Sequence, residues 1–207
     1  MSETTPKGRR SGPAKLPTLH GDFDIHVWKH NRREQVALIK GSIADGKEIL
    51  VRIHSECLTG DAFASLRCDC GPQLQASMKR IQEEGRGIIV YLDGHEGRGI
   101  GVFNKIAAYG LQDKGMDTFA ANVALGLAED YREYSAAAHI LKDLHVKSVR
   151  LLTNNPDKAT AIQSFGIKVL EILPLVAGKN KHNEKYLRAK AERGHTALST
   201  QQMEKIA

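Results

Sequence analysis

The three cysteines of this chain all lie within the segment CLTGDAFASLRCDC, which runs from Cys57 to Cys70. Their C-x10-C-x-C spacing leaves an odd number of thiols, and a C-x-C pair closes only as a strained disulfide. Three thiolates can hold a zinc ion while a fourth position stays open for water, as in catalytic zinc sites. His54 is close enough in sequence to complete a structural Cys3His site instead. The pattern favours catalytic zinc, ahead of structural zinc and then of unligated core cysteines.

A glycine-rich stretch, GHEGRGIG, spans Gly94 to Gly101. Glycines let backbone N–H groups approach phosphate oxygens, and a predicted helix follows with its positive end towards them. Arg98 has the geometry to clamp phosphate oxygens, and Glu96 can hold magnesium or accept a hydrogen bond from a base. The motif fits neither standard nucleotide-binding pattern, so an ordinary turn is the alternative.

Two further stretches contain polar residues beside predicted strands. RIHSE, Arg52 to Glu56, leads directly into Cys57, which places Arg52 and His54 near the metal. TNNPDK follows another strand, so Thr153 and Lys158 are expected at a strand end, where ligands bind in α/β sheets. A routine turn with proline at the first helical position is the alternative.

The elements that must position these residues follow from hydrophobic periodicity. Alternating or β-branched apolar residues predict strands, and a spacing of three to four residues predicts helices. We expect strands at 23–28, 34–41, 48–55, 87–92, 149–154 and 167–175, and helices at 71–85, 104–115, 135–145 and 155–166. Gly85 is expected to end the first helix and Ser135 to cap the third. The last strand, helix and strand suggest a βαβ unit in a mixed sheet, hence a single α/β domain.

Composition limits the function classes. The chain has 207 residues and a net charge of +6, with basic residues concentrated near both ends. This charge favours an anionic partner, either a nucleic acid or a phosphorylated small molecule, although basic tails more often only aid solubility. Residues 1–15 are expected to be a disordered leader without a secretory signal, and a cytoplasmic protein with free thiols is predicted. The low aromatic content of 5% argues against a platform for stacking single-stranded bases.

Taken together, the motifs resemble those of GTP cyclohydrolase II. The resemblance rests on VRIHSECLTGDAFASLRCDCGPQL, HEGRGIG, NKIAAYGLQD, TNNPDK and NEKYLRAKAERGH. It implies a domain over residues 16–196 with a tail at 197–207. It also implies loss of C8 of GTP as formate and release of pyrophosphate, to give 2,5-diamino-6-(5-phosphoribosylamino)pyrimidin-4-one, the first step of riboflavin synthesis. Zinc, magnesium and a homodimer belong to the same expectation. Many members carry a fused second synthase domain; this chain is too short for one and is expected to act alone.

The resemblance also assigns roles to individual residues. The zinc ligands would be Cys57, Cys68 and Cys70, with Tyr109 near the base, Asp130 as proton acceptor and Arg132 as nucleophile. The GTP contacts would be Arg52, Ile53, His54, Ser55, Glu56, Gln73, Glu96, Gly97, Arg98, Thr118, Thr153 and Lys158. A guanidinium stays protonated and lacks a free lone pair, so a phosphate clamp is the more economical role for Arg132.

The chain departs from the family pattern at Asp93, where arginine is usual. A carboxylate facing a triphosphate would be costly, so we expect Asp93 to point away from the γ-phosphate or to pair with a nearby Lys or Arg. One alternative is a divergent relative that stops at a formylated intermediate or serves another pathway. A zinc-stabilised nucleic-acid-binding module is the other, but the chain lacks a C-x2-C pair and a basic aromatic face.

Overall fold

The computed structural model describes residues 10–116, 118–128, 130–192 and 194, apart from the side chains of residues 118, 119 and 122. The strands are β1 (Arg10–Thr18), β2 (Gly21–His30), β3 (Arg33–Lys40), β4 (Ile49–Ser55), β5 (Gly87–Leu92), β6 (Ser148–Leu152) and β7 (Lys168–Leu173). The helices are α1 (Leu58–Asp61), α2 (Cys70–Glu84), the 3-10 turn η1 (Glu96–Gly99), α3 (Gly101–Asp113), α4 (Thr118–Ala124), α5 (Ser135–Asp143), α6 (Pro156–Ser164) and α7 (Glu184–Glu192). Among these described ranges, every helix is too short or too polar to cross a lipid bilayer.

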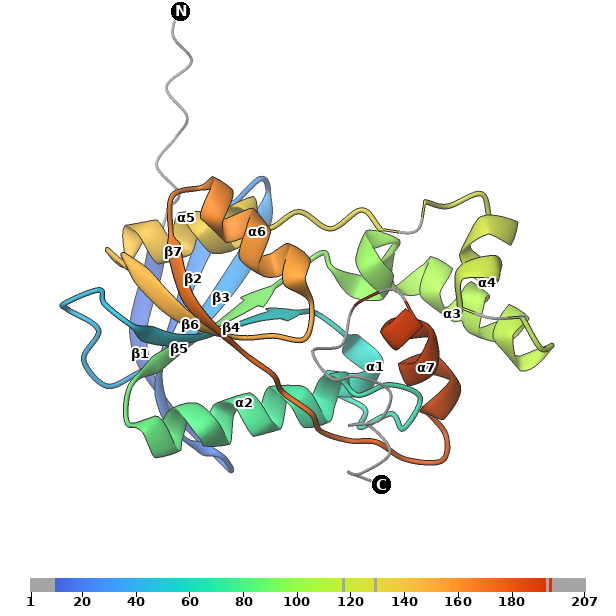
Figure 1. Cartoon of the computed structure of the whole chain (residues 1–207), viewed down its shortest axis with the longest axis horizontal. Helices are drawn as coiled ribbons and strands as arrows, with labels where there is room; N and C mark the ends of the chain where they lie inside the picture. The colour runs from blue at the N-terminus through green and yellow to red at the C-terminus, as the bar shows by residue number, and fades with distance from the viewer. Residues whose placement is uncertain (1–9, 117, 129, 193, 195–207) are drawn as a thin grey trace, which may run out of the picture.

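The strands form one mixed sheet in the order β1-β2-β3-β5-β4-β6-β7 (Figure 1). β1, β2, β3 and β5 pair antiparallel, whereas β5, β4, β6 and β7 run parallel. The parallel half contains the predicted βαβ unit, β6-α6-β7. The expected α/β fold with a mixed sheet is therefore confirmed.

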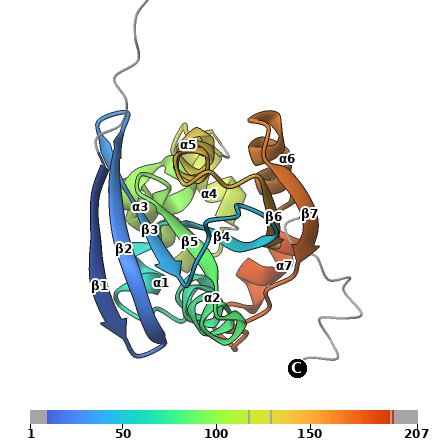
Figure 2. The same ribbon diagram turned by 90° about the vertical axis from the view of Figure 1, so that its left-hand side faces the viewer.

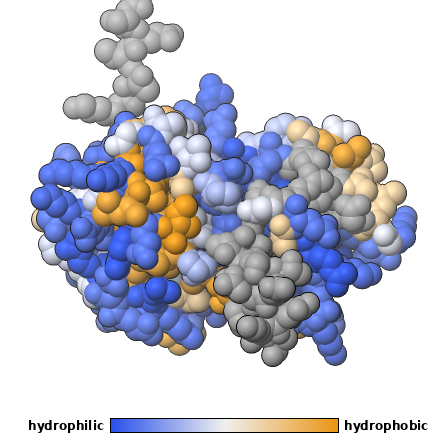
Figure 3. Space-filling model, in the orientation of Figure 1, coloured by the Kyte–Doolittle hydropathy of each residue, from blue (hydrophilic) through white to orange (hydrophobic). Residues whose placement is uncertain are grey.

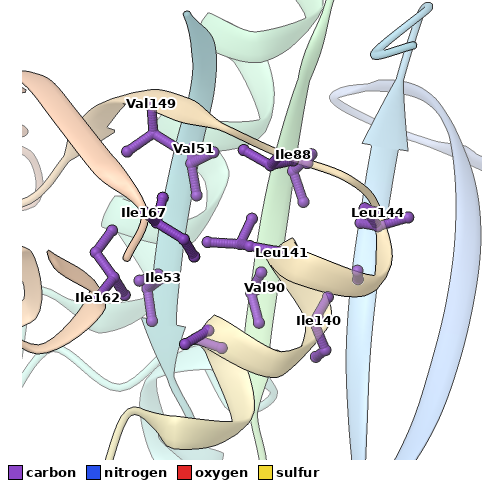
Figure 4. Packing of buried hydrophobic residues seen from close by; sticks show 14 of the residues in the cluster. Val51, Ile53, Ile88, Val90, Ile140, Leu141, Leu144, Val149, Ile162 and Ile167 are labelled. Atoms are coloured by element: carbon purple, nitrogen blue, oxygen red, sulfur yellow. The ribbon is translucent and has the colours of Figure 1, made fainter. Parts of the chain in front are cut away.

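Helices cover both faces of the sheet (Figure 2). On one face α2 buries Met78 and Ile81 against Phe23, Leu50 and Ile89. On the other face α5 and α6 cover the strands. Figure 4 shows how side chains from α5 and α6 meet those of the central strands there: Ile140, Leu141 and Ile162 against Val51, Ile53, Ile88 and Val90. Because β5 is buried on both faces, its sequence GIIVYL is a nearly continuous apolar run, whereas the equally buried β4 also carries Arg52 and His54.

The carboxyl ends of β4, β5 and β6 meet at one edge of the sheet. There the chain enters α1, η1 and the start of α6, and α3 and α7 lie beside them (Figure 1). The cysteine segment follows β4, the glycine loop follows β5 and TNNPDK follows β6, so parallel topology brings all three motifs together.

Two expectations about local structure were wrong. Residues 10–15, assigned to a disordered leader, belong to β1; residues 1–9 of that leader and the tail at 197–207 lie outside the described residues. β1 is an exposed edge strand that pairs with β2 through its backbone, so it lacks the apolar alternation that signals a half-buried strand. Ser135 is the first residue of α5, and the N-cap is Tyr134, which makes no side-chain capping bond. By contrast, Gly85 ends α2 in the left-handed conformation, as expected.

Candidate active site

The three cysteine sulfurs converge at the sheet edge. Their Sγ atoms lie within 4.8 Å of one another, and Cys57 and Cys68 are 3.7 Å apart. Cys57 follows β4, Cys68 precedes α2 and Cys70 is its first residue, so three backbone positions are fixed by two rigid elements. Sulfur donors at this separation, largely shielded from water, suit a zinc ion.

Close packing around the cluster leaves no room for a side chain at Gly60 or Gly71. A Cβ atom at Gly60 would lie 2.9 Å from Cys68 Sγ and 3.2 Å from Cys57 Sγ. One at Gly71 would lie 2.2 Å from the Gly60 carbonyl oxygen. The two glycines therefore let α1 and α2 approach closely enough for the sulfurs to meet.

Electrostatics within the cluster favour thiolate at Cys57. Hydrogen bonding with the Cys68 and Cys70 thiols holds the pKa of Cys57 far below its usual range. The same interaction with Cys57 raises the pKa of Cys68 to about 11. Metal binding would displace the remaining protons, because thiolates are the ligands of zinc.

His54 does not belong to the sulfur cluster. Its Nε2 lies 3.0 Å from both carboxylate oxygens of Asp61. Oδ2 of Asp61 also accepts hydrogen bonds from the Cys57 amide at 3.0 Å and the Tyr91 hydroxyl at 2.9 Å. Asp61 thus fixes the turn that carries Cys57. The interpretation as a structural Cys3His site is not supported, since the cluster of candidate ligands found among the described residues comprises the three cysteines.

A pocket opens beside the sulfurs and gathers most of the predicted site. Its lining includes Arg52, His54, Ser55, Glu56, Cys57, Cys68, Cys70, Gln73, Glu96, Gly97, Arg98, Tyr109, Arg132, Thr153 and Lys158. Three predicted residues are not in that lining. The Ile53 side chain is buried in the core, and Asp130 pairs with Arg132. Thr118 is the first residue of α4, and its side chain is among those that the structure does not describe.

Positive charge is concentrated at one side of this pocket. Burial, followed by the charges of Arg52 and Arg132, lowers the pKa of Lys158, whose ammonium donates to the Ile53 carbonyl at 2.8 Å. Arg52 donates to the Leu152 carbonyl at 3.1 Å and to Gln73 Oε1 at 2.7 Å. Like charges crowded in this way would gain stability from a bound anion.

Arg132 and Asp130 form an ion pair at the pocket. Nε of Arg132 lies 2.9 Å from Asp130 Oδ1, and Nη2 donates to Oδ2. Burial disfavours the charged form of Arg132, but the hydrogen bonds to Asp130 outweigh it and raise the pKa of the guanidinium further. Those hydrogen bonds also lower the pKa of Asp130 despite its burial, which makes this carboxylate a weaker base.

Several pocket residues were not predicted. His95 lies within the glycine loop; burial, then the charges of Lys158 and Arg132, lower its pKa to about 4, so it is neutral at pH 7. Lys105 on α3 and Lys190 on α7 also line the pocket. Lys190 forms an ion pair with Asp69 at 2.9 Å, so the basic C-terminal segment is more than the solubilising tail that composition suggested. Asp69 in turn accepts a hydrogen bond from Gln73.

Asp93 follows β5 and lies outside the pocket lining. Its carboxylate pairs with Arg33 at 3.5 Å, and its backbone is held on both sides by the Gln35 side chain. The expectation that Asp93 would pair with a nearby basic residue is confirmed.

The α/β fold, the three-sulfur cluster and the basic pocket together suit a class of proteins that bind a metal ion and an anion at the carboxyl ends of parallel strands. Comparison with known proteins narrows this class. The sequence model of GTP cyclohydrolase II matches residues 9–174, and the chain belongs to the GTP cyclohydrolase II family.

Two relatives of similar sequence agree with this assignment. A protein named GTP cyclohydrolase-2 from Neisseria meningitidis serogroup B is 54% identical over 183 residues, which cover 87% of this chain and 92% of the relative. The riboflavin biosynthesis protein RibBA of Salinispora tropica is 51% identical over 185 residues, covering 88% of this chain and 46% of that protein. A solved structure of a two-domain 3,4-dihydroxy-2-butanone 4-phosphate synthase from A. baumannii is 18% identical, with a TM-score of 0.49 over 82% of this chain and 41% of the other. The chain therefore spans about half the length of the RibBA relative but nearly all of the Neisseria protein.

Proposed function

We propose that this chain hydrolyses GTP, opening the imidazole ring with release of formate and pyrophosphate, as the first step of riboflavin biosynthesis. The observation that carries the proposal is the placement of three cysteine sulfurs beside a pocket lined by Arg52, Arg132 and Lys158. A nucleotide has a chemical group for each part of this site. Its phosphates match the basic side of the pocket, and its purine matches the side that carries the three sulfurs.

Cys57, Cys68 and Cys70 would hold one zinc ion per chain. A zinc ion bound there supplies Lewis acidity and makes water nucleophilic near neutral pH. Arg52, Lys158 and Arg132 would bind the phosphates and neutralise the charge that develops when pyrophosphate leaves. Asp130 would hold Arg132 in place, and magnesium would accompany the triphosphate.

Formation of a homodimer also belongs to the proposal. Phe103, Val102 and Ile106 on α3 are 84%, 43% and 50% exposed, and apolar side chains gather around the α3–α4 end and over β7 on the face that Figure 3 shows. Exposed apolar surface of this kind suits contact with a second copy, which supports the predicted homodimer. A cytoplasmic location stays a prediction from the sequence.

Incubation of the zinc-loaded protein with GTP and magnesium tests the proposed reaction. Equal amounts of formate, pyrophosphate and the diaminopyrimidinone product are expected, measured by chromatography and mass spectrometry. Accumulation of a formylated pyrimidine with little free formate would instead identify the divergent relative. Absence of any change to GTP in fully loaded protein would contradict the proposal.

Tyr109→Phe is expected to separate the two halves of the reaction. The Tyr109 ring lies under the Arg67 guanidinium at 4.2 Å, and its hydroxyl is 3.5 Å from Thr59 Oγ1. Burial raises the pKa of Tyr109, so the hydroxyl keeps its proton and can donate it. Loss of the hydroxyl should slow formate release about a hundredfold, the low end for acid–base catalysis, while pyrophosphate release persists.

The measurement is the rate of each product from the same reaction. Tyr131→Phe is the control, because Tyr131 is 53% exposed and accepts a hydrogen bond from the Ala128 amide. An equal fall of both rates with weaker GTP binding would make Tyr109 a general binding residue.

Asp93→Arg is expected to change KM for GTP by less than about tenfold, or 1.4 kcal/mol. The reason is that Asp93 faces Arg33 outside the pocket lining. The charge swap Arg33→Asp with Asp93→Arg is the matched control, since it restores an opposite-charge pair. A gain in GTP affinity well beyond tenfold in steady-state kinetics would show that Asp93 opposes the phosphates.

A further inference from the structure

Lys105 connects the sulfur cluster to the glycine loop. Its ammonium, on a side chain only 9% exposed, lies 3.2 Å from Cys57 Sγ, 2.9 Å from Thr59 Oγ1 and 2.5 Å from Glu96 Oε1. The other carboxylate oxygen of Glu96 accepts the Leu58 amide at 2.6 Å, on the turn that carries Cys57. The three N–H donors of one ammonium are therefore all directed at the metal-site turn and the loop that faces it.

The charge balance of this arrangement points to a role beyond packing. Three thiolates and one zinc ion carry a formal charge of −1, and Glu96 adds a second negative charge that is 5% exposed. Buried charges are tolerated when they are paired and hydrogen-bonded. Lys105 contacts both negative groups directly, so it offsets the charge of the loaded centre and holds Glu96 in place.

We infer that Lys105 is a positioning residue that tunes the metal centre by donating a charged hydrogen bond to the Cys57 thiolate. This inference rests on the proposed function for its zinc ion. The bond stabilises the sulfur lone pairs, which weakens electron donation to the metal and leaves a stronger Lewis acid. The positive charge of Lys105 also offsets the formal charge of −1 on the zinc–thiolate centre, which stabilises the bound metal.

If Lys105 only held the loop in place, its removal would leave the sulfur–metal bond unchanged. Substitution of cobalt for zinc distinguishes this role from tuning of the metal centre. Co²⁺ bound by thiolates gives a sulfur-to-metal charge-transfer band whose energy depends on the sulfur lone pairs. Removal of the hydrogen bond in Lys105→Met should shift this band to lower energy. The zinc dissociation constant, measured by competition with a chelator at pH 7, should rise by about 10- to 100-fold, the usual effect of losing a partner of a metal ligand.

The controls separate this effect from changes in folding. Lys114→Met removes an exposed lysine just beyond α3 and should leave both the band and the zinc affinity unchanged. Lys105→Gln keeps a polar group that can bond to Thr59 and Glu96, and it replaces Lys105→Met in the experiment if that variant does not fold. The band should again shift to lower energy and the zinc dissociation constant should again rise, both by smaller amounts. Circular dichroism confirms that each variant is folded.

An unshifted band together with a zinc affinity within about threefold of the parent, in a folded Lys105 variant, would overturn the inference. That result would leave the proposed function intact if the parent protein binds zinc and converts GTP. Failure of the parent protein to bind zinc or cobalt would instead contradict the proposed function itself.

Discussion

Cys68→Ser is expected to abolish zinc binding and ring opening together. A serine hydroxyl does not ionise near pH 7, and the two remaining sulfurs leave the metal with too few strong ligands. Zinc content, measured by mass spectrometry, should fall from about one ion per chain to near zero. The rate of formate release should fall at least about a thousandfold, equivalent to about 4 kcal/mol of transition-state stabilisation.

A control in the same loop separates the metal effect from loop distortion. Phe63 lies between Cys57 and Cys68 and is 70% exposed, so Phe63→Ser should keep its zinc. Full activity in a metal-free Cys68→Ser protein would show that the sulfurs are not a catalytic metal site.

Much of this site could be predicted from the sequence because its parts are local. The cysteine spacing, the glycine loop and TNNPDK each follow an apolar strand, and the strands pair in parallel. Parallel topology alone then places the three segments at one edge. The C-terminal end of helix α2 could also be predicted, because its apolar spacing stops where a glycine, Gly85, follows, and the structure ends the helix there.

The residues that sequence reasoning missed act through contacts across long stretches of chain. Lys105 meets Cys57 across 48 positions, and Lys190 meets Asp69 across 121. A lysine on an amphipathic helix is ordinarily a solvated residue, and its own segment contains no sign of a buried carboxylate or thiolate. β1 was missed for a related reason, because backbone pairing with β2 rather than burial of its side chains holds it.

Arg132 provides the second large effect and distinguishes two mechanisms of pyrophosphate release. Its guanidinium is 12% exposed, paired with Asp130 and raised in pKa by that pair, so it keeps its proton and acts as a cation. Arg132→Gln removes the charge and the fork geometry, and should slow pyrophosphate release by about 10²- to 10³-fold, as loss of one preorganised donor does elsewhere. Arg132→Lys keeps the charge without the fork and should retain part of the rate.

Rapid-quench measurement of pyrophosphate, with mass spectrometry of the protein during turnover, tests this clamp role against a nucleophilic one. Arg150→Gln is the matched control, since Arg150 forms a similar ion pair with Glu84 at 2.6 Å and lies outside the pocket lining. A clamp leaves the protein unmodified at every time point, because the guanidinium only neutralises the phosphates. A guanylyl adduct on Arg132 that forms and decays at the turnover rate would mean that Asp130 removes a proton from the arginine, despite the lowered pKa of the Asp130 carboxyl group. The clamp role of Arg132 would then be wrong.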